Sequence, residues 1–275
     1  MKYIYIIIII FGLSSCKKER TSEPNPKPIL QHSSPDIKLD HFNIWVDRPE
    51  KAKQKLEEIG FYAVPDSLST VHVGQGTTGK YFYFLNSYLE LIFPYNQEEF
   101  DKNNKINHLM DFYERANHTT NGASPFGLAL KIKDYDLDKV PFNIVAYHQN
   151  WMKENASIYA AKNSKINLKE PSIFIVYPEI ESDVFQTMDD LKNIPEEYSF
   201  VRTFYKHPNG AQKVTKIHIT SNGLNSDSKT IKTINNIEKI STENGKEHLM
   251  ELYFDNGIQN KSFDLRPELP IIIHL

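Results

Sequence analysis

The side chains best suited to chemistry lie in one stretch, residues 71–92, which reads VHVGQGTTGKYFYFLNSYLELI. Its β-branched and aromatic residues are typical of strands. Three glycines between positions 74 and 79 weaken a strand unless the backbone turns tightly or another group approaches it closely. Glu90 lies between two leucines, where an unpaired carboxylate is costly to bury, and His72 precedes the glycines. The stretch therefore predicts part of a site.

The glycine-rich segment GQGTTG, residues 74–79, has two interpretations. Successive backbone N–H groups can form a nest for anions, as in phosphate-binding loops. Such loops lead into a helix, whereas residues 80–85 are strand formers. We therefore favour a turn that lets the backbone approach a ligand, with Gln75 and Thr77 offering polar contacts.

A second strand of the site is predicted over residues 39–47, LDHFNIWVD, because polarity alternates along it. Leu39, His41, Asn43 and Trp45 are expected on one face, and the residues between them on the other. His41 then points away from the apolar side chains that pack under the next element.

The next element is predicted to be a helix, because apolar residues recur at helical spacing after residue 49. Pro49 suits its first turn, and Gly60 suits the left-handed position that often ends a helix. Strands follow near 61–64, at 80–85 and at 88–94. The order is therefore β-α-β-β-β.

The rest of the chain repeats this order less completely, and internal repetition is its main organisational feature. A helix around 107–116 connects the first unit to the second. The second unit has a strand within 124–138, a helix near 138–154, and strands near 157–161 and 172–177. A shorter third unit has a strand at 211–221, a helix at 227–240, and strands at 248–256 and 269–275.

Several segments together resemble the glyoxalase-like branch of the vicinal oxygen chelate superfamily. They are LDHFNIWV, the Gly60-Phe61 pair, HVGQGTTGKYFYFLNSYLELI, PSIFIV and HPNGA, with the likeness strongest over 39–95 and thin beyond 220. The resemblance implies an α+β fold, in which repeated β-α-β-β-β modules form an open curled mixed sheet around a cleft. It assigns residues 38–275 to this domain, with module one at 39–95, module two at about 124–180 and the third unit at about 207–275.

The resemblance also implies a site. In metal-dependent members, a His on the first strand and a Glu on the last strand of each module bind one divalent ion, positions that match His41 and Glu90 here. Module two offers no matching ligands, and His72 would complete a two-His-one-carboxylate set for Fe, Zn, Mn or Ni. The alternative is that His41 and Glu90 hydrogen-bond each other and a buried water.

Other histidines are interpreted more simply. His207, in the turn HPNGA, is expected on the surface. His218 and Glu251 repeat the His–Glu theme in the third unit, and we interpret them as a chance match or a solvated face.

The N-terminus predicts export. Residues 1–16 resemble a bacterial lipoprotein signal peptide that ends at a lipidated Cys16, although a plain signal peptide that contains a cysteine is the alternative. Residues 17–37 are rich in charge, Pro and Ser, which is typical of a flexible tether. We expect lipid anchoring in the cell envelope, and Lys17 in place of Asp favours the outer over the inner membrane.

Composition limits the function classes. The net charge of −3, with acids and bases interspersed, argues against a nucleic-acid partner, and 12% aromatic residues predict a real core. We expect a membrane-tethered protein that binds a small oxygenated or aromatic molecule in its cleft and that forms a homodimer. The alternative is a metal-dependent lyase, isomerase or dioxygenase, with Glu90 as a ligand or general base.

Overall fold

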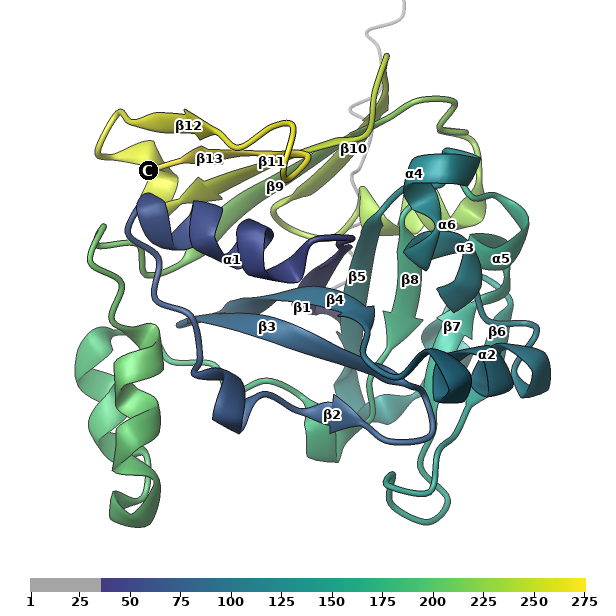
Figure 1. Cartoon of the computed structure of the whole chain (residues 1–275), viewed down its shortest axis with the longest axis horizontal. Helices are drawn as coiled ribbons and strands as arrows, with labels where there is room; N and C mark the ends of the chain where they lie inside the picture. The colour runs from purple at the N-terminus through teal and green to yellow at the C-terminus, as the bar shows by residue number, and fades with distance from the viewer. Residues whose placement is uncertain (1–35) are drawn as a thin grey trace, which may run out of the picture. The chain divides into compact units, whose positions relative to one another are not determined.

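The computed structural model describes residues 36–275 (Figure 1). The predicted signal peptide, Cys16 and nearly all of the predicted tether lie outside the described residues. Within residues 36–275, no helix has the length and apolar character needed to cross a membrane.

An eight-stranded mixed sheet, strongly curled, forms the larger part of the fold. Its strand order is β2-β3-β4-β1-β5-β8-β7-β6. The strands are β1 (Ile37–Trp45), β2 (Val71–His72), β3 (Thr77–Phe84), β4 (Ser87–Pro94), β5 (Phe126–Ile132), β6 (Ile144–Tyr147), β7 (Ile158–Ala161) and β8 (Ser172–Ile175).

The two halves of this sheet, on either side of the β1–β5 pair, have the same strand order from the centre outward. β1 and β5 are antiparallel neighbours, β4 is parallel to β1, and β8 is parallel to β5. The sheet therefore consists of two modules with one connectivity, module one (β1–β4) and module two (β5–β8). The α+β class and the repeated, curled mixed sheet predicted from the sequence are confirmed.

The first strand of module one follows the predicted alternation from His41 onward. Phe42 and Ile44 of β1 are fully buried with Leu56 of α1 (Pro49–Glu58), as the alternation predicts. The pairing of β1 with β5 shifts register between Leu39 and His41, which is a β-bulge at Asp40. The bulge reverses the residues before it, so Leu39 packs against the core and does not share the face of His41, and that part of the prediction was wrong.

Three predicted elements differ in the structure. The strand expected near 61–64 is absent, and the short β2 takes its place in the sheet. The helix expected near 138–154 is replaced by one 3-10 turn (Leu137–Lys139) and β6, because Pro141 opposes a helix interior and Ile144 and Val145 favour a strand. The helix expected around 107–116 is shorter, Phe112–Ala116, and follows an unpredicted helix, α2 (Gln97–Ile106).

Short helices complete the chain. The α-helices are α1 (Pro49–Glu58), α2 (Gln97–Ile106), α3 (Phe112–Ala116), α4 (His118–Asn121), α5 (Lys162–Ile166) and α6 (Lys229–Ile234). The 3-10 helices are η1 (Asp66–Leu68), η2 (Lys133–Tyr135), η3 (Leu137–Lys139), η4 (Pro178–Ile180), η5 (Met188–Asn193), η6 (Glu196–Tyr205) and η7 (Asp255–Gly257).

The third unit forms a separate five-stranded sheet in the order β10-β9-β11-β13-β12. Its strands are β9 (Val214–Ser221), β10 (Ile240–Asn244), β11 (Leu249–Phe254), β12 (Ser262–Asp264) and β13 (Ile271–His274). In the modules, the helix or its replacement leads to the far edge of the sheet, whereas α6 leads to β10, directly beside β9. The third unit is therefore not a further copy of the module, which corrects the sequence interpretation.

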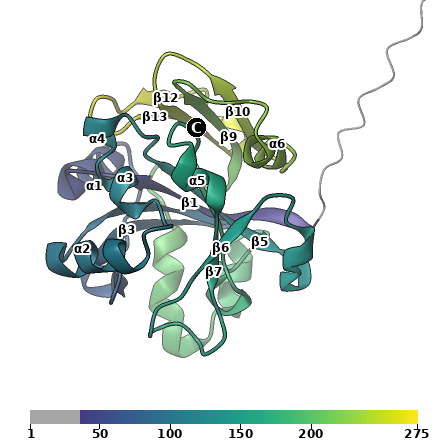
Figure 2. The same cartoon turned by 90° about the vertical axis from the view of Figure 1, so that its right-hand side faces the viewer.

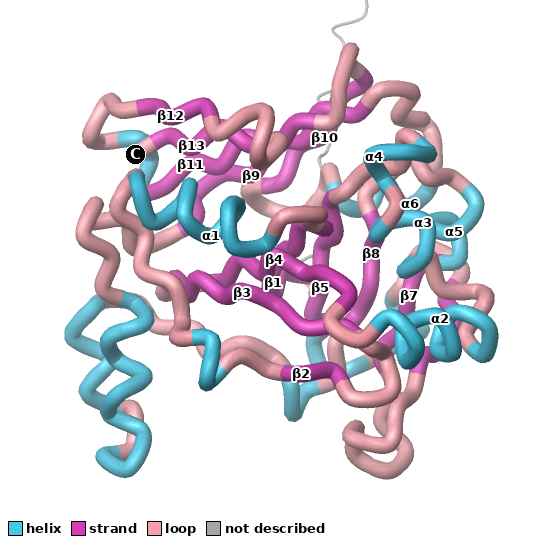
Figure 3. Tube along the Cα trace, viewed as in Figure 1, coloured by secondary structure: helices cyan, strands magenta, loops and turns pink. Residues whose placement is uncertain are grey.

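The outer face of the large sheet is covered by other elements, whereas part of its inner face is not. Figures 1 and 2 show α1 between the second sheet and the strands of module one. The outer faces of both modules, α1 and the second sheet share one apolar core. On the inner face, η5 and η6 pack against module one beside Tyr81 and Leu85 (cyan helical segments in Figure 3). The remaining inner face encloses the cavity described next.

Candidate functional site

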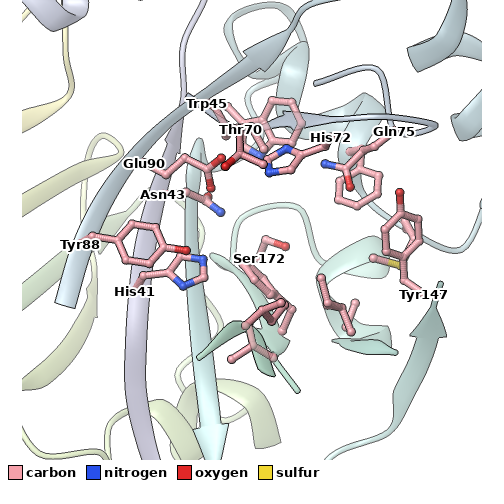
Figure 4. A pocket seen from close by; sticks show the side chains of 18 of the residues that line it. His41, Asn43, Trp45, Thr70, His72, Gln75, Tyr88, Glu90, Tyr147 and Ser172 are labelled. Atoms are coloured by element: carbon pink, nitrogen blue, oxygen red, sulfur yellow. The ribbon is translucent and has the colours of Figure 1, made fainter. Parts of the chain in front are cut away.

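A cavity of about 270 Å³ lies on the inner face of the large sheet, and both modules line it (Figure 4). Its polar side chains come mainly from module one: His41, Asn43, Thr70, His72, Gln75 and Glu90. Its aromatic side chains come from both modules and from α3: Trp45, Tyr81, Tyr83, Tyr88, Phe112, Tyr147, Trp151 and Phe174. The walls therefore combine aromatic rings with a small number of polar groups, as small-molecule sites do.

His41 is held from two sides. Its Nδ1 lies 2.6 Å from Oδ1 of Asp40, and its ring stacks on Tyr88 with the centroids 4.2 Å apart. Asp40 is fully buried and also accepts hydrogen bonds from the backbone N–H and the hydroxyl of Ser182. Since Nδ1 is engaged, Nε2 is the ring nitrogen of His41 that remains open to a ligand.

The charge of Asp40 is stabilised within the fold. Burial alone would raise the pKa of Asp40, but the hydrogen bond and charge of His41, the N–H of Ser182 and the charge of Lys131 together hold that pKa below its ordinary value. Asp40 therefore remains an acceptor that fixes the orientation of the His41 ring.

Glu90 and Asn43 face the cavity from neighbouring strands. They are register partners on β4 and β1, and each is only 5% exposed. Glu90 Oε1 accepts a hydrogen bond of 3.1 Å from the Tyr81 hydroxyl. Burial and then the charge of Glu90 raise the pKa of Tyr81 far above its ordinary value, so this hydroxyl remains a donor. Asn43 Oδ1 is buried without a hydrogen-bond partner in the described part of the chain.

The glycines of the predicted turn have two different roles. Gly74 and Gly76 have φ angles of +83° and +76°, the left-handed region that favours glycine. Gly79 lies in β3 and leaves room for a side chain, because a Cβ there would lie 2.7 Å from Glu90 Oε1. Both reasons anticipated from the sequence, a tight turn and a close approach, therefore apply.

His72, Gln75 and Thr77 form a small polar group at the turn. His72 Nδ1 lies 3.0 Å from Thr77 Oγ1, and Gln75 Nε2 donates to the same oxygen at 2.7 Å. His72 and Gln75 line the cavity, whereas Thr77 is fully buried behind them. Burial lowers the pKa of His72, which favours its neutral form. Thr77 thus positions its neighbours and does not reach a ligand, unlike the contact expected from the sequence.

The predicted metal set is not assembled. Among residues 36–275, no group of three His, Cys, Asp or Glu side chains has an arrangement that could hold a metal ion. Asp40 and Thr77 engage the Nδ1 atoms of His41 and His72, and the Tyr81 hydroxyl donates to Glu90, but Nε2 of each histidine and the Glu90 carboxylate are not gathered into one such group. The described residues therefore do not fit the divalent ion implied by the resemblance. The alternative of a direct His41–Glu90 hydrogen bond also fails within these residues.

Module two and the segment before it contribute to the cavity in ways that the sequence patterns did not indicate. Ser172 and Phe174 of β8 line the cavity, although no ligand was predicted in module two. Ser172 donates to Asp111, which is bound at 2.8 Å to the fully buried Arg115. Alternation along PSIFIV would have indicated the cavity face of β8, but no sequence signal marks Asp111.

The other histidines among residues 36–275 do not line the cavity. His207 is buried, not on the surface as predicted, because its ring joins two segments: Nδ1 accepts from the N–H of Tyr62, and Nε2 donates to the carbonyl of Tyr83. His218 and Glu251 lie opposite each other on β9 and β11 of the second sheet, half-buried.

The known proteins compared with this chain resemble it only distantly. No family model matches the chain, and no curated protein matches it. A solved structure described as a hypothetical protein from Staphylococcus aureus is 13% identical, with a TM-score of 0.48, over 86% of this chain and 97% of that one. Methylmalonyl-CoA epimerase from Mycobacterium tuberculosis is 14% identical, with a TM-score of 0.32, over 52% of this chain and 90% of that one. A variant of the Streptomyces coelicolor methylmalonyl-CoA epimerase, in complex with 2-nitronate-propionyl-CoA, is 14% identical, with a TM-score of 0.33, over 50% of this chain and 96% of that one. These values do not establish a family for the chain.

Proposed function

We propose that this protein binds a small oxygenated or aromatic molecule in the cavity between its two modules. The observation that carries this proposal is a cavity of about 270 Å³, walled by aromatic rings, into which buried polar groups with few or no partners project. Asn43 Oδ1 has no hydrogen bond within the described residues, although buried polar atoms normally have one. A ligand with a hydrogen-bond donor would satisfy this oxygen.

The chain contains its own reporter of binding. Its two tryptophans, Trp45 and Trp151, both line the cavity. Titration with hydroxylated and carbonyl-bearing benzene derivatives should give saturable changes in tryptophan fluorescence. Trp45→Phe should leave a binding signal from Trp151, and Trp151→Phe one from Trp45.

A larger side chain placed in the cavity tests the location of binding, and the same substitution at an exposed position is the matched control. Ala160 on β7 lines the cavity, whereas Ala146 on β6 is exposed. Ala160→Leu should abolish the titration while circular dichroism shows a folded protein, and Ala146→Leu should bind as the parent does. Binding that survives Ala160→Leu unchanged, or the absence of binding across the panel, would count against the proposal.

The proposal includes a membrane tether. Its support is the sequence of residues 1–16, with a positive start, an apolar run and a terminal Cys16. Lipidation of Cys16 would hold the cavity near a membrane surface, with the outer membrane favoured. Cys16→Ala should give soluble or unprocessed protein, measured by membrane fractionation and intact mass. An unchanged mass and distribution would contradict the tether.

An enzyme is the second candidate, and the Asp40–His41 hydrogen bond favours it. A carboxylate bound to Nδ1 fixes the tautomer in which Nε2 can accept a proton. His41 could then remove a proton next to a carbonyl group without a metal. In D2O, exchange of the methylene protons of phenylacetone should be accelerated by the protein and not by His41→Gln. Equal exchange with both proteins would leave binding as the function.

A further inference from the structure

Glu90 is a buried carboxylate without a cationic partner in the described part of the chain. It is 5% exposed, and its one hydrogen bond comes from the neutral hydroxyl of Tyr81. None of the ion pairs among residues 36–275 includes it. Carboxylates in such surroundings are normally paired, because removing the charge from water is costly.

The other carboxylates near the cavity already have cations. Asp111 is paired with Arg115 at 2.8 Å, and Asp40 lies against His41 and 3.4 Å from the Lys131 ammonium. The residues that line the cavity in the described chain include no lysine or arginine, and the two histidines that line it, His41 and His72, are bound through Nδ1 to Asp40 and Thr77. Among these residues Glu90 is therefore the carboxylate without a cation, which disfavours anionic ligands.

Aromatic rings surround this carboxylate. Tyr81 and Tyr88 flank Glu90, with their ring centroids 6.1 Å apart, and Tyr83 lies 5.2 Å from Tyr88. Trp45 and Trp151 line the same cavity. The face of an aromatic ring attracts a cation, most strongly where water is excluded. Rings and carboxylate thus favour the same kind of ligand for independent physical reasons.

We infer that the ligand is an organic cation of the substituted-ammonium class, with its charged group against Glu90 and its apolar part among the aromatic rings. This inference rests on the proposed function, because it names the chemistry of the molecule that the cavity binds. Figure 4 shows Glu90, Asn43 and His72 directed toward the same interior, where the head of such a ligand would lie. A cation that also carries a donor group could satisfy Asn43 Oδ1.

Three probes that share a benzyl group and differ in charge test the inference. They are benzyltrimethylammonium, benzyl alcohol and phenylacetate, each titrated by tryptophan fluorescence and by calorimetry at constant ionic strength. The cation should bind at least about tenfold more tightly than the neutral probe, as expected for a desolvated charge contact. Phenylacetate should bind more weakly than either.

Two matched variants locate the charge. Glu90→Gln keeps the shape of the side chain and should weaken the cation by roughly tenfold while leaving benzyl alcohol within about twofold. Glu238→Gln removes the same charge from an exposed site on the third unit and should change the binding of neither probe. Trp151→Leu should weaken the cation more than Trp151→Phe, which retains an aromatic face.

The outcomes separate the two proposals. If benzyl alcohol or phenylacetate binds as tightly as the cation, or if Glu90→Gln leaves cation binding unchanged, the inference is wrong while ligand binding stands. If none of the three probes binds, both fail. A cation preference that is lost in Glu90→Gln and kept in Glu238→Gln supports both.

Discussion

The two modules share one strand order and present different chemistry to the cavity. On β1 and β4, module one carries His41, Asn43 and Glu90. Opposite His41 and Asn43, β5 of module two carries only Ala129 and Gly127. The small residues make the larger ones possible, because a Cβ on Gly127 would lie 2.3 Å from Asn43 Oδ1. Two modules with the same connectivity therefore differ in role: module one supplies polar side chains, and β5 of module two supplies small residues that leave room for them. The fold alone does not define the site.

The modules also differ in what stabilises them. The outer face of module one is covered by α1, whose Ala52 and Leu56 are buried. Module two has 3-10 turns where that helix would be, and the second sheet shares its apolar core. A buried arginine joins the segments that lead into β5 and β8: Arg115 donates to the carbonyls of Ser124, Ser164 and Leu168. Module two thus depends on a polar network where module one depends on a helix.

The largest loss of stability is expected from a substitution that removes this polar network. Arg115→Met leaves the buried Asp111 without its cation and the carbonyls of Ser124 and Ser164 without a donor, whereas the carbonyl of Leu168 still accepts from the N–H of Ser124. We expect a loss of about 3–5 kcal/mol in the free energy of unfolding, measured by urea denaturation. Lys192→Met is the control, because Lys192 forms its ion pair with Asp189 at the exposed surface and its loss should cost less than about 1 kcal/mol. Similar losses in the two variants would show that module two does not depend on Arg115.

The next effect concerns the far end of module one, where His207 joins residues 62 and 83. Burial lowers the pKa of His207 to about 4, against an ordinary value near 6.5. The unfolded chain therefore binds more protons than the folded one between pH 6.5 and 4, so stability falls as the pH decreases through this window. The loss should approach about 3 kcal/mol below pH 4.

His207→Gln tests this assignment. The variant lowers stability at pH 7, because glutamine cannot reproduce both hydrogen bonds of the ring. It should also flatten the decrease between pH 6.5 and 4, measured by urea denaturation at each pH. A decrease as steep as in the parent would assign the pH dependence to other groups.

A smaller effect tests the fit between the modules. Gly127→Ala places a methyl group against the Asn43 side chain and should cost about 1–3 kcal/mol. Asn43→Ala removes the obstacle, so the double variant should recover most of that loss. A double-mutant cycle should therefore give a coupling energy of at least about 1 kcal/mol, whereas additive effects would show that the two residues are independent.

The sequence predicted the parts of this arrangement that depend on local pattern. Alternation placed His41 and Glu90 on one face, and the glycines at 74–79 indicated a turn and a close approach. The bulge at Asp40 could not be predicted, because it arises from pairing with β5, a partner nearly 90 residues away. The Asp40–His41 hydrogen bond was missed for the same reason.

Other features depend on contacts between distant segments. Asn43, Tyr81 and Tyr88 lay in predicted strands, and their faces followed from the same alternation, but a single sequence does not show which inward residues meet a cavity. Asp111 directly precedes α3 and Trp151 lies in a turn, and no sequence pattern marks either residue as facing the cavity. The second sheet was predicted as a third copy because strand order depends on nonlocal pairing, which periodicity does not contain.

The smallest expected effect on the free energy of unfolding is a gain instead of a loss, and it distinguishes a carboxylate of the site from one that stabilises the fold. Glu90 and Glu170 are both buried glutamates, 5% and 1% exposed. Glu170 accepts hydrogen bonds from Asn163, Asn167 and Thr230, whereas Glu90 accepts one, from Tyr81. Glu170 is therefore part of the scaffold, and Glu90 has the few partners expected of a group that awaits a ligand.

Substitution by glutamine should separate the two roles in the ligand-free protein. Glu170→Gln weakens several charged hydrogen bonds and should cost about 1–3 kcal/mol. Glu90→Gln removes an uncompensated buried charge, while its amide oxygen can still accept from Tyr81, so it should be neutral or stabilise the fold by about 1 kcal/mol. Urea denaturation of both variants at pH 7 measures the difference. If Glu90→Gln destabilises the protein as much as Glu170→Gln, Glu90 belongs to the scaffold, and the cavity loses the charged group on which cation binding depends.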